Sequence, residues 1–505
     1  MSKKKNMKAN AIFALIAAMA AGLSGCMVGP DFETPEADMP EKWSNEADAK
    51  SITDIGVPRK MTPEELATWW EIFDDPMLTS LIKRSFEGNL SIRIAAERIA
   101  QARATLGVTQ SGFFPSVNVN AGMSENGHPI DVTSTSYGMG ATAAWEIDVF
   151  GGVRRGIESA AADYNAAIAN KAAARISVAA EVAQNYFTYR CVQHEILITR
   201  SNLETQKGTY RATLARQKSG FVSKLDTVRA AAQVDSTSAQ LPVLERELKL
   251  TRHALEYLLG LKTGALEKEL SDVGPLPALE KYIPISVPAE LLERRPDIIA
   301  AEYKLHAATA KIGNARADYY PKFSITGNIS YEAPKIGNIV QNQYGSWSVG
   351  PNVSWNIFQA GKTVYNVKLQ EALTREAGVN WEDAVLTAIK EVEDALVSAE
   401  KERARIEHLN RMVENYRKAF ELSRELYTQG EIEFIDLLEA QRSMLSSAQN
   451  QVLSRKDFIG YIIMLYKSLG GGWTEADVAD EPENLDWIFF DSLGDNPERT
   501  AAAEK

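Results

Sequence analysis

The chain has 505 residues, 24% of them charged, and a formal net charge of -12 at pH 7. Its composition is that of a folded protein rather than a disordered or fibrous one, and its length allows several domains. The acidic balance argues against a nucleic-acid-binding protein, because phosphate recognition needs a basic face and Lys and Arg are here mixed with a larger number of Asp and Glu.

The N-terminus has the features of a bacterial export signal. Four lysines within residues 3–8 are followed, from Ala11, by about ten apolar residues, too few to span a bilayer. Small residues then lead to Cys26, a pattern that resembles the lipobox of bacterial lipoprotein precursors. It predicts a lipoprotein signal peptide over residues 1–25 and acylation of Cys26, which anchors the mature chain to a membrane. The alternative is an ordinary signal peptide with a chance cysteine.

Four short segments alternate apolar and polar residues with a period of two and predict four strands. They lie around residues 117–123, 137–147, 323–332 and 347–357. At roughly nine to eleven residues, each has the length of a tilted membrane strand, with aromatic residues placed as in a girdle at the membrane surface. The alternative is a half-buried sheet in a soluble protein.

Two segments, residues 152–218 and 362–429, contain no proline and predict helices of about 100 Å each. Small and apolar residues recur at spacings of three and four, which indicates coiled-coil packing without strict heptads. The pattern alone is also that of a solvated coiled-coil dimer. Directly attached to membrane strands, such helices are expected to prolong a barrel as a tube. The packing residues in the second segment are Ala388, Val392, Ala395, Leu396 and Ala399.

The two halves of the chain are a tandem duplication. Residues 107–122 match residues 313–328 at an offset of 206, and the segments from Trp145 and Gly220 match those from Trp355 and Gly430 at an offset of 210. Each copy is predicted to run helix, strand, strand, very long helix, turn, helix. The predicted divisions are residues 1–25 (signal peptide), 26–75 (lipidated segment), 76–273 (first repeat), 274–290 (linker), 291–470 (second repeat) and 471–505 (acidic tail).

Four strands cannot close a barrel alone, and a sheet edge exposed to hydrocarbon leaves backbone groups unpaired. Several copies are therefore expected to associate. Two copies give eight strands with a filled interior, and three give twelve, wide enough for a water-filled lumen. The polar positions predicted to face that lumen are Asn118, Asn120, Ser324, Thr326, Asn328, Asn352 and Asn356.

Several stretches together resemble the outer membrane factors, the TolC-like channels of tripartite efflux systems. They are "CMVGPDF" from Cys26, "WWEIFDDPMLTSLI" from Trp69, "LLERRPDIIAAE" from Leu291, both glycine-to-aspartate turns and "LGGGW" ending at Trp473. The resemblance covers nearly the whole mature chain. It implies an α+β membrane protein: a homotrimer with a twelve-stranded transmembrane β-barrel continued by a periplasmic helical barrel. It also implies a location in the outer membrane of a Gram-negative bacterium, and a periplasmic adaptor and an inner membrane transporter as partners.

The turns after the long helices are expected at the periplasmic tip, where the matching family segment closes the tube. Ile435, Glu439 and Arg442 share one helical face, so we expect an apolar ring of Ile435 to close the tip while Glu439 and Arg442 tie neighbouring helices. The alternative for Glu439 and Arg442 is an ordinary surface pair. Gly220 and Gly430 form the turns, and Asp226 and Asp436 are predicted to be turn and cap acceptors rather than ion ligands.

No catalytic, metal or cofactor site is predicted. The segment GKT at residues 361–363 lacks the earlier glycine of a phosphate loop, because Asn356 stands there. The five histidines lie in unrelated elements, so neither a zinc site nor a His-based triad is proposed. Two hypotheses follow: a passive efflux conduit for small molecules, or a structural envelope lipoprotein that does not conduct. An enzyme is a distant third.

Overall fold

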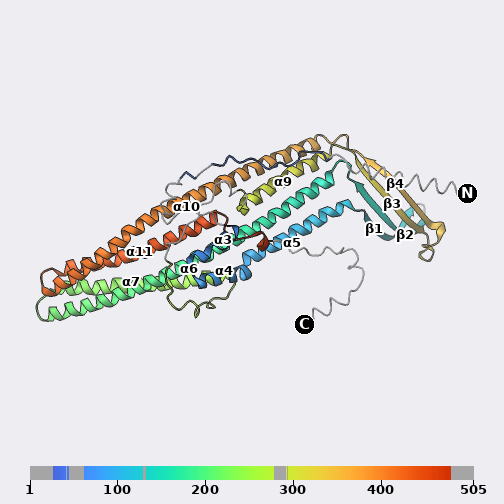
Figure 1. Cartoon of the computed structure of the whole chain (residues 1–505). Helices are drawn as coiled ribbons and strands as arrows, with labels where there is room; N and C mark the ends of the chain where they lie inside the picture. Colours follow the sequence, from blue (N-terminus) through green and yellow to red (C-terminus); the bar gives the residue numbers. More distant parts are fainter. Residues whose placement is uncertain are drawn as a thin grey trace.

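The molecule is long. A small β-sheet lies at one end, and the connections that join one helix to the next, α6 to α7 and α10 to α11, lie at the other end (Figure 1). The computed structural model describes residues 27–40, 43–44, 62–128, 132–277, 292 and 294–478. The predicted signal peptide, Cys26, most of the linker and the end of the acidic tail lie outside these residues. In the described part, the elements follow the predicted order twice, with two strands, a very long helix, a turn and a shorter helix in each repeat.

The four predicted strands form one antiparallel sheet in the order β1-β2-β3-β4. Its central pair, β2 and β3, comes from different repeats, so the sheet joins the two halves of the chain. Each outer strand, β1 and β4, leaves one edge without a partner strand among the described residues. The bounds are Ser116–His128 for β1, Val132–Ile147 for β2, Lys322–Ala333 for β3 and Gly345–Ser354 for β4, with the 3-10 turns η3 Ile336–Asn338 and η4 Asn342–Tyr344 between the last two.

The fourth strand is shorter than the alternation predicts. Ser354 pairs with Lys322, and the residue before Lys322 is Pro321, which has no N–H to donate to the ladder. Pairing with β3 therefore stops at Ser354. The prediction that this strand continues through Asn356 is wrong for the single chain.

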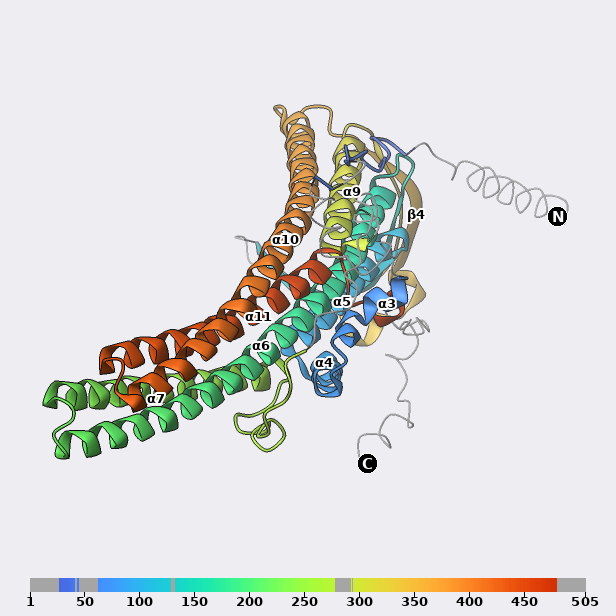
Figure 2. The same cartoon turned by 60° about the vertical axis from the view of Figure 1, so that its left-hand side comes forward.

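The two very long helices are present with the predicted ends. They are α6 (Gly152–Lys218) and α10 (Lys362–Gln429), and Figure 2 shows that both curve along their length. Each begins after a glycine with positive φ, 78° at Gly151 and 84° at Gly361, a conformation that side-chain-bearing residues rarely adopt. All five small and apolar residues predicted to pack in α10 are buried.

Shorter helices placed end to end cover each long helix (Figure 1). In the first repeat, α5 (Leu90–Gln110) and α7 (Lys224–Leu258) pack on α6. In the second, α9 (Pro296–Ala317) and α11 (Phe434–Ser468) pack on α10. Both α9 and α11 also contact α6, so the repeats form one body.

At each junction, the residue before the upper helix also binds the end of the lower helix. Asn89 caps α5 with its side-chain oxygen, and its Nδ2 donates to the carbonyl of Leu258 at 2.7 Å. Arg295 stands 206 residues later, and its Nη1 donates to the carbonyl of Ser468 at 3.0 Å. The last carbonyls of a helix have no intrahelical partner, so these contacts satisfy groups that would otherwise be buried unpaired.

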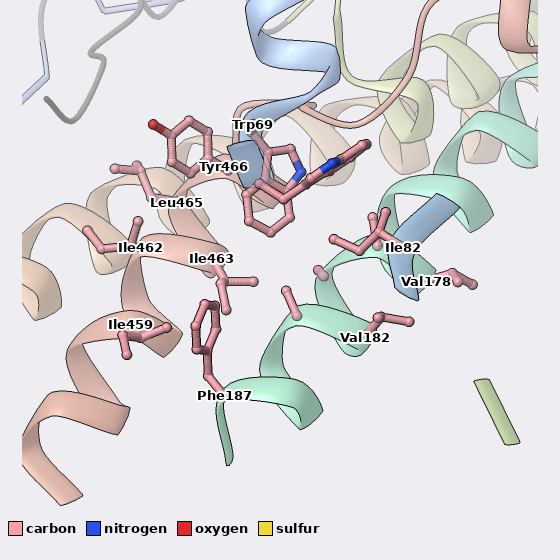
Figure 3. Close-up of a cluster of buried hydrophobic side chains, with 14 of the residues drawn as sticks. Trp69, Ile82, Val178, Val182, Phe187, Ile459, Ile462, Ile463, Leu465 and Tyr466 are labelled. Carbon is pink, nitrogen blue, oxygen red and sulfur yellow. The ribbon is translucent and has the colours of Figure 1, made fainter. Parts of the chain in front are cut away.

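The largest core lies partway along the molecule, where helices of both repeats meet. Trp69 stacks on Tyr466 of α11 with ring centroids 5.4 Å apart (Figure 3). Phe73 packs on Phe187 of α6, with ring centroids 4.7 Å apart. Burial raises the pKa of the Tyr466 hydroxyl. Three N-terminal elements contribute to this core: α3 (Pro63–Ala67), η1 (Trp69–Phe73) and α4 (Pro76–Gly88). A short helix, α12 (Glu475–Val478), follows α11.

The N-terminal residues 27–40 run along the helices from the base of the sheet toward this core. The amide of Val28 donates to the carbonyl of Phe150, at the point where β2 leads into α6. Farther along, Phe32 stacks on His306 of α9 with ring centroids 4.4 Å apart. An otherwise irregular segment is therefore held by specific contacts.

Gly88 and Gly107 offer a matched test of the helix junction. A Cβ at Gly88 lies 2.2 Å from the carbonyl oxygen of Leu259, whereas one at Gly107 meets nothing within 4 Å. We expect Gly88→Ala to lower the free energy of unfolding by about 1–3 kcal/mol, because backbone must shift. Gly107→Ala is expected to raise it by about 0.5–1 kcal/mol. Denaturant unfolding of the detergent-solubilised protein measures the free energy of unfolding of both variants. Equal changes in the two variants contradict the close backbone contact between Gly88 and Leu259.

Candidate functional site

The polar residues of the four strands lie on one face of the sheet. The register places Asn118, Thr142, Asn328 and Ser348 side by side in one row across β1 to β4. The hydroxyl of Ser348 donates to Oδ1 of Asn328 at 3.2 Å. Alternate residues of a strand share a face, so this row fixes the orientation of all four strands.

The predicted lumen residues occupy this polar face with one exception. Asn356 lies beyond the end of β4, in the loop before α10, and is exposed. Whether the common face lines a channel stays a prediction for the single chain. The residues that share it are Asn118, Asn120, Ser324, Thr326, Asn328 and Asn352.

The opposite face of the sheet is mainly apolar, and no described segment covers its central row. Its central row contains Val119, Ala141, Ile329 and Trp347. Val119 is 78% exposed and Trp347 77% exposed, values far above those of core residues. A continuous exposed apolar surface of this kind marks contact with a membrane or another protein.

An equivalent indole contact marks the base of the sheet in each repeat. Trp145 Nε1 donates to the carbonyl of Phe113 at 2.8 Å, and Trp355 Nε1 donates to the carbonyl of Tyr319 at 3.0 Å. Aromatic side chains with one polar atom are favoured where hydrocarbon meets water. Trp145 and Trp355 are among the residues for which an aromatic girdle is predicted, and that role stays a prediction.

At the opposite end, glycines form the two tight turns. Gly220 ends α6 and Gly430 ends α10, with φ angles of 78° and 84°. In both turns the glycine and the residue after it donate back to the carbonyls of the last helical turn. This left-handed ending suits glycine because it has no Cβ.

The two predicted aspartates differ in their contacts. Asp226 accepts hydrogen bonds from the amide and hydroxyl of Ser223, and the Ser223 hydroxyl accepts from the Asp226 amide, which makes a complete capping box. In the second repeat Glu433 stands at the cap position and makes no side-chain cap bond. Asp436 lies in the first turn of α11, where its charge favours the helix dipole.

Arg216, which the sequence analysis did not single out, joins the two repeats at the tip. Its Nη1 donates to the carbonyl of Tyr427 at 2.6 Å, and its guanidinium lies 4.7 Å from the centroid of the Tyr427 ring. Tyr427 in turn packs against Phe434 across the second turn. A basic residue in the last turn of α6 was visible in the sequence, but its partner is 211 residues away.

The three predicted gate residues lie on α11 near the tip. Ile435 is 37% exposed, a high value for an apolar residue beside a buried cluster. Arg442 Nε donates to Oε1 of Gln233 on α7 at 2.6 Å, so it links neighbouring helices of the same chain. Glu439 is exposed, and no ion pair joins it to Arg442 among the described residues. Their role at a closed tip stays a prediction.

Further polar contacts follow the seam between the α6–α7 and α10–α11 pairs. Seven residues after the Arg442 contact, Gln449 Nε2 lies 3.2 Å from Oε1 of Gln240. The same Nε2 also lies 3.5 Å from Oγ1 of Thr199 on α6. The apolar cluster of the tip instead lies mainly within the α10–α11 pair. The seam between the pairs is therefore more polar than the packing within the second pair.

The start of the described chain is fixed at the base of the sheet. Met27 lies against Gly151, so close that a Cβ there meets Met27 at 2.8 Å. Arg155 donates to the carbonyl of Val28 and pairs with Asp31 at 2.6 Å. Cys26 itself is outside the described residues, and the residue after it lies at the boundary between sheet and helices.

Among the described residues, no group of three or more His, Cys, Asp or Glu side chains is placed to hold a metal ion. No described helix combines the length and the apolar composition that a membrane-spanning helix needs.

Comparison with known proteins places the chain in a family. Residues 81–261 and 287–471 match the family described as "Outer membrane efflux protein". The chain belongs to this family. Members are outer membrane transport channels, not enzymes, and the two matched segments correspond to the two repeats.

Relatives and solved structures agree with this assignment. Nodulation protein T of Rhizobium leguminosarum bv. viciae is 32% identical over 91% of this chain and 94% of its own. The toluene efflux pump outer membrane protein TtgI of Pseudomonas putida is 31% identical over 90% of this chain and 96% of its own. The outer-membrane channel OprN superposes with a TM-score of 0.81 and 34% identity, covering 89% of this chain and 100% of that chain. The recognised family and the outer membrane location are thereby confirmed.

The difference between the two caps gives a reciprocal test. Ser223→Ala removes a capping hydroxyl, a loss of about 0.5–2 kcal/mol, and is expected to speed amide hydrogen exchange in the first turn of α7. Glu433→Ser supplies a hydroxyl three residues before Asp436 and is expected to slow exchange in the first turn of α11. Unchanged exchange in both variants contradicts the capping assignment.

Proposed function

We propose that three copies of this chain form one channel through the outer membrane and into the periplasm. Three four-stranded sheets give twelve strands, which close into a barrel with a water-filled interior. Closure gives every edge strand a partner, which hydrocarbon demands. The observation that carries the proposal is a sheet with one largely polar face and one exposed apolar face, whose outer strands each leave an edge without a partner among the described residues.

In the proposed assembly, the helices continue the barrel as a tube. α6 and α10 follow directly on β2 and β4, so twelve strands lead into six long helices, each about 100 Å in length. Exposed apolar residues along α10, among them Tyr365, Leu369, Val379 and Leu386, supply contacts to neighbouring copies.

We place the gate at the helical tip. In a trimer, Ile435 becomes an apolar ring that closes the tube, with Glu439 and Arg442 between neighbouring helices. The hydrogen bonds of Arg442 to Gln233 and of Arg216 to Tyr427 hold the α10–α11 pair against the α6–α7 pair. Opening requires these contacts to break. The polar seam between the pairs supports this, because water replaces polar contacts at lower cost than apolar ones.

We further propose the partners and the anchor. Acylation of Cys26 places lipid beside Met27 at the base of the sheet, the level at which the apolar face ends. A periplasmic adaptor contacts the tip, and an inner membrane transporter supplies the energy, since the sequence has no nucleotide-binding motif. Relatives are named for toluene and for cation efflux, and a lining of amides and hydroxyls suits small molecules of several kinds.

Conductance in planar bilayers tests the channel and its gate. The wild-type protein is expected to give rare, small current steps, and Arg216→Gln to give larger ones, because the variant loses the tie to Tyr427. Ile435→Gly is expected to do the same by removing the ring. Arg211→Gln, an exposed arginine of the same helix, is the matched control and should resemble the wild type. Absence of current steps in every variant contradicts the channel, and unchanged steps in both test variants contradict the gate.

A further inference from the structure

Charged side chains are rare in the four described strands. Only Glu125, Glu146, Lys322 and Glu332 among their residues are Asp, Glu, Lys or Arg. The register places Glu146, Lys322 and Glu332 on the polar face of the sheet and Glu125 on the apolar face. The rest of the polar face consists mainly of Asn, Ser, Thr and Gly. Its electrostatic potential therefore depends largely on three residues.

Two of these three charges lie together at the base of the sheet, where the helices begin. Glu146 is paired with Ser324, and Lys322 stands two residues before Ser324 on the same face. Lys322 Nζ also lies 3.3 Å from Oδ1 of Asp318. Opposite charges at such short range partly cancel. The base of the polar face therefore has little net charge.

Glu332 lies at the other end of the sheet, as the penultimate residue of β3. Its row in the register contains Gly138 and Gly122, so no side chain of that row crowds its carboxylate. The hydroxyl of Ser136 donates to Glu332 Oε1 at 2.6 Å, which directs the carboxylate without neutralising its charge. No ion pair joins Glu332 to Lys335, in the loop that follows, or to any other residue in the described part of the chain.

The two ends of the polar face are far enough apart to act separately. Along β3, Ser324 in the row of Glu146 and Glu332 are separated by about 27 Å, at about 3.4 Å per residue. The Debye length is about 10 Å at 0.1 M salt, so the charges at the base are screened at this distance. Among the strand residues, Glu332 therefore determines the potential at the outer end of the polar face.

We propose that Glu332 sets the charge preference of the channel, because three copies place a ring of carboxylates at the outer end of the lumen that favours cations over anions. The inference rests on the channel proposed above and adds a residue that discriminates among the solutes in it. Such a ring raises the local concentration of cations and lowers that of anions. Cargo that carries an amine or a metal cation therefore leaves more readily than a carboxylate or phosphate of similar size.

Reversal potentials in planar bilayers test this assignment. Arg216→Gln serves as the background, because it is expected to give the larger current steps. In KCl gradients near 0.1 M, where the Debye length is about 10 Å, this background is expected to favour K⁺ over Cl⁻. Adding Glu332→Gln should lower the permeability ratio by at least about twofold, and Glu332→Lys should reverse the preference. Glu125→Gln removes the same charge from the apolar face and is the matched control, with no change expected.

Salt supplies a second readout of the same ring. Near 1 M KCl the Debye length is about 3 Å, so the background and Glu332→Gln should give the same permeability ratio. Current steps whose ratio near 0.1 M is unchanged by Glu332→Gln contradict the role of Glu332 and leave the channel standing. An equal fall in Glu125→Gln contradicts it as well, because the effect is then not specific to the polar face. Absence of current steps in every variant contradicts the channel, and this inference with it.

Discussion

Backbone hydrogen bonding at the two edges of the sheet is the constraint on which the rest of this molecule depends. A strand edge in water is solvated, but in hydrocarbon each unpaired N–H or C=O costs several kcal/mol. The described part of the chain contains four strands, and within it the outer edges of β1 and β4 have no partner strand. The exposed apolar face of the sheet is suited to hydrocarbon. The unpaired edges of a single sheet are not. In the proposed assembly, neighbouring copies supply partners for these edges, and the helices prolong the barrel because α6 and α10 follow directly on β2 and β4.

The internal duplication is visible in both the sheet and the helices. Both repeats keep the same strand register, because the β1–β2 pairs become the β3–β4 pairs when they are moved by 206 and 210 residues. The helical part is duplicated as well. Asn89 and Arg295 lie at equivalent helix junctions, and each donates a side-chain hydrogen bond to a carbonyl at the end of the lower helix. The repeats also differ in some of their caps. At the tip, Ser223 completes a capping box in one turn, while Glu433 in the other does not.

Much of the fold could be predicted because its signals are local. Alternation in the strand segments, proline-free helical stretches and glycine at the turns each follow from neighbouring residues. The early end of β4 could not be, because it depends on Pro321, which directly precedes the neighbouring strand β3. The contact of Arg216 with Tyr427 joins residues in different repeats, and the hydrogen bond of Arg442 to Gln233 depends on how two helix pairs pack. Periodicity within one helix carries no information on either.

The number of copies in the folded particle tests the central claim most directly. Native mass spectrometry of the full-length protein, released from outer membranes in mild detergent, counts them without labels or substitutions. Three chains per particle is the result that the proposed twelve-stranded barrel predicts. A particle of one chain that keeps its strand content, measured by circular dichroism on the same sample, contradicts the account.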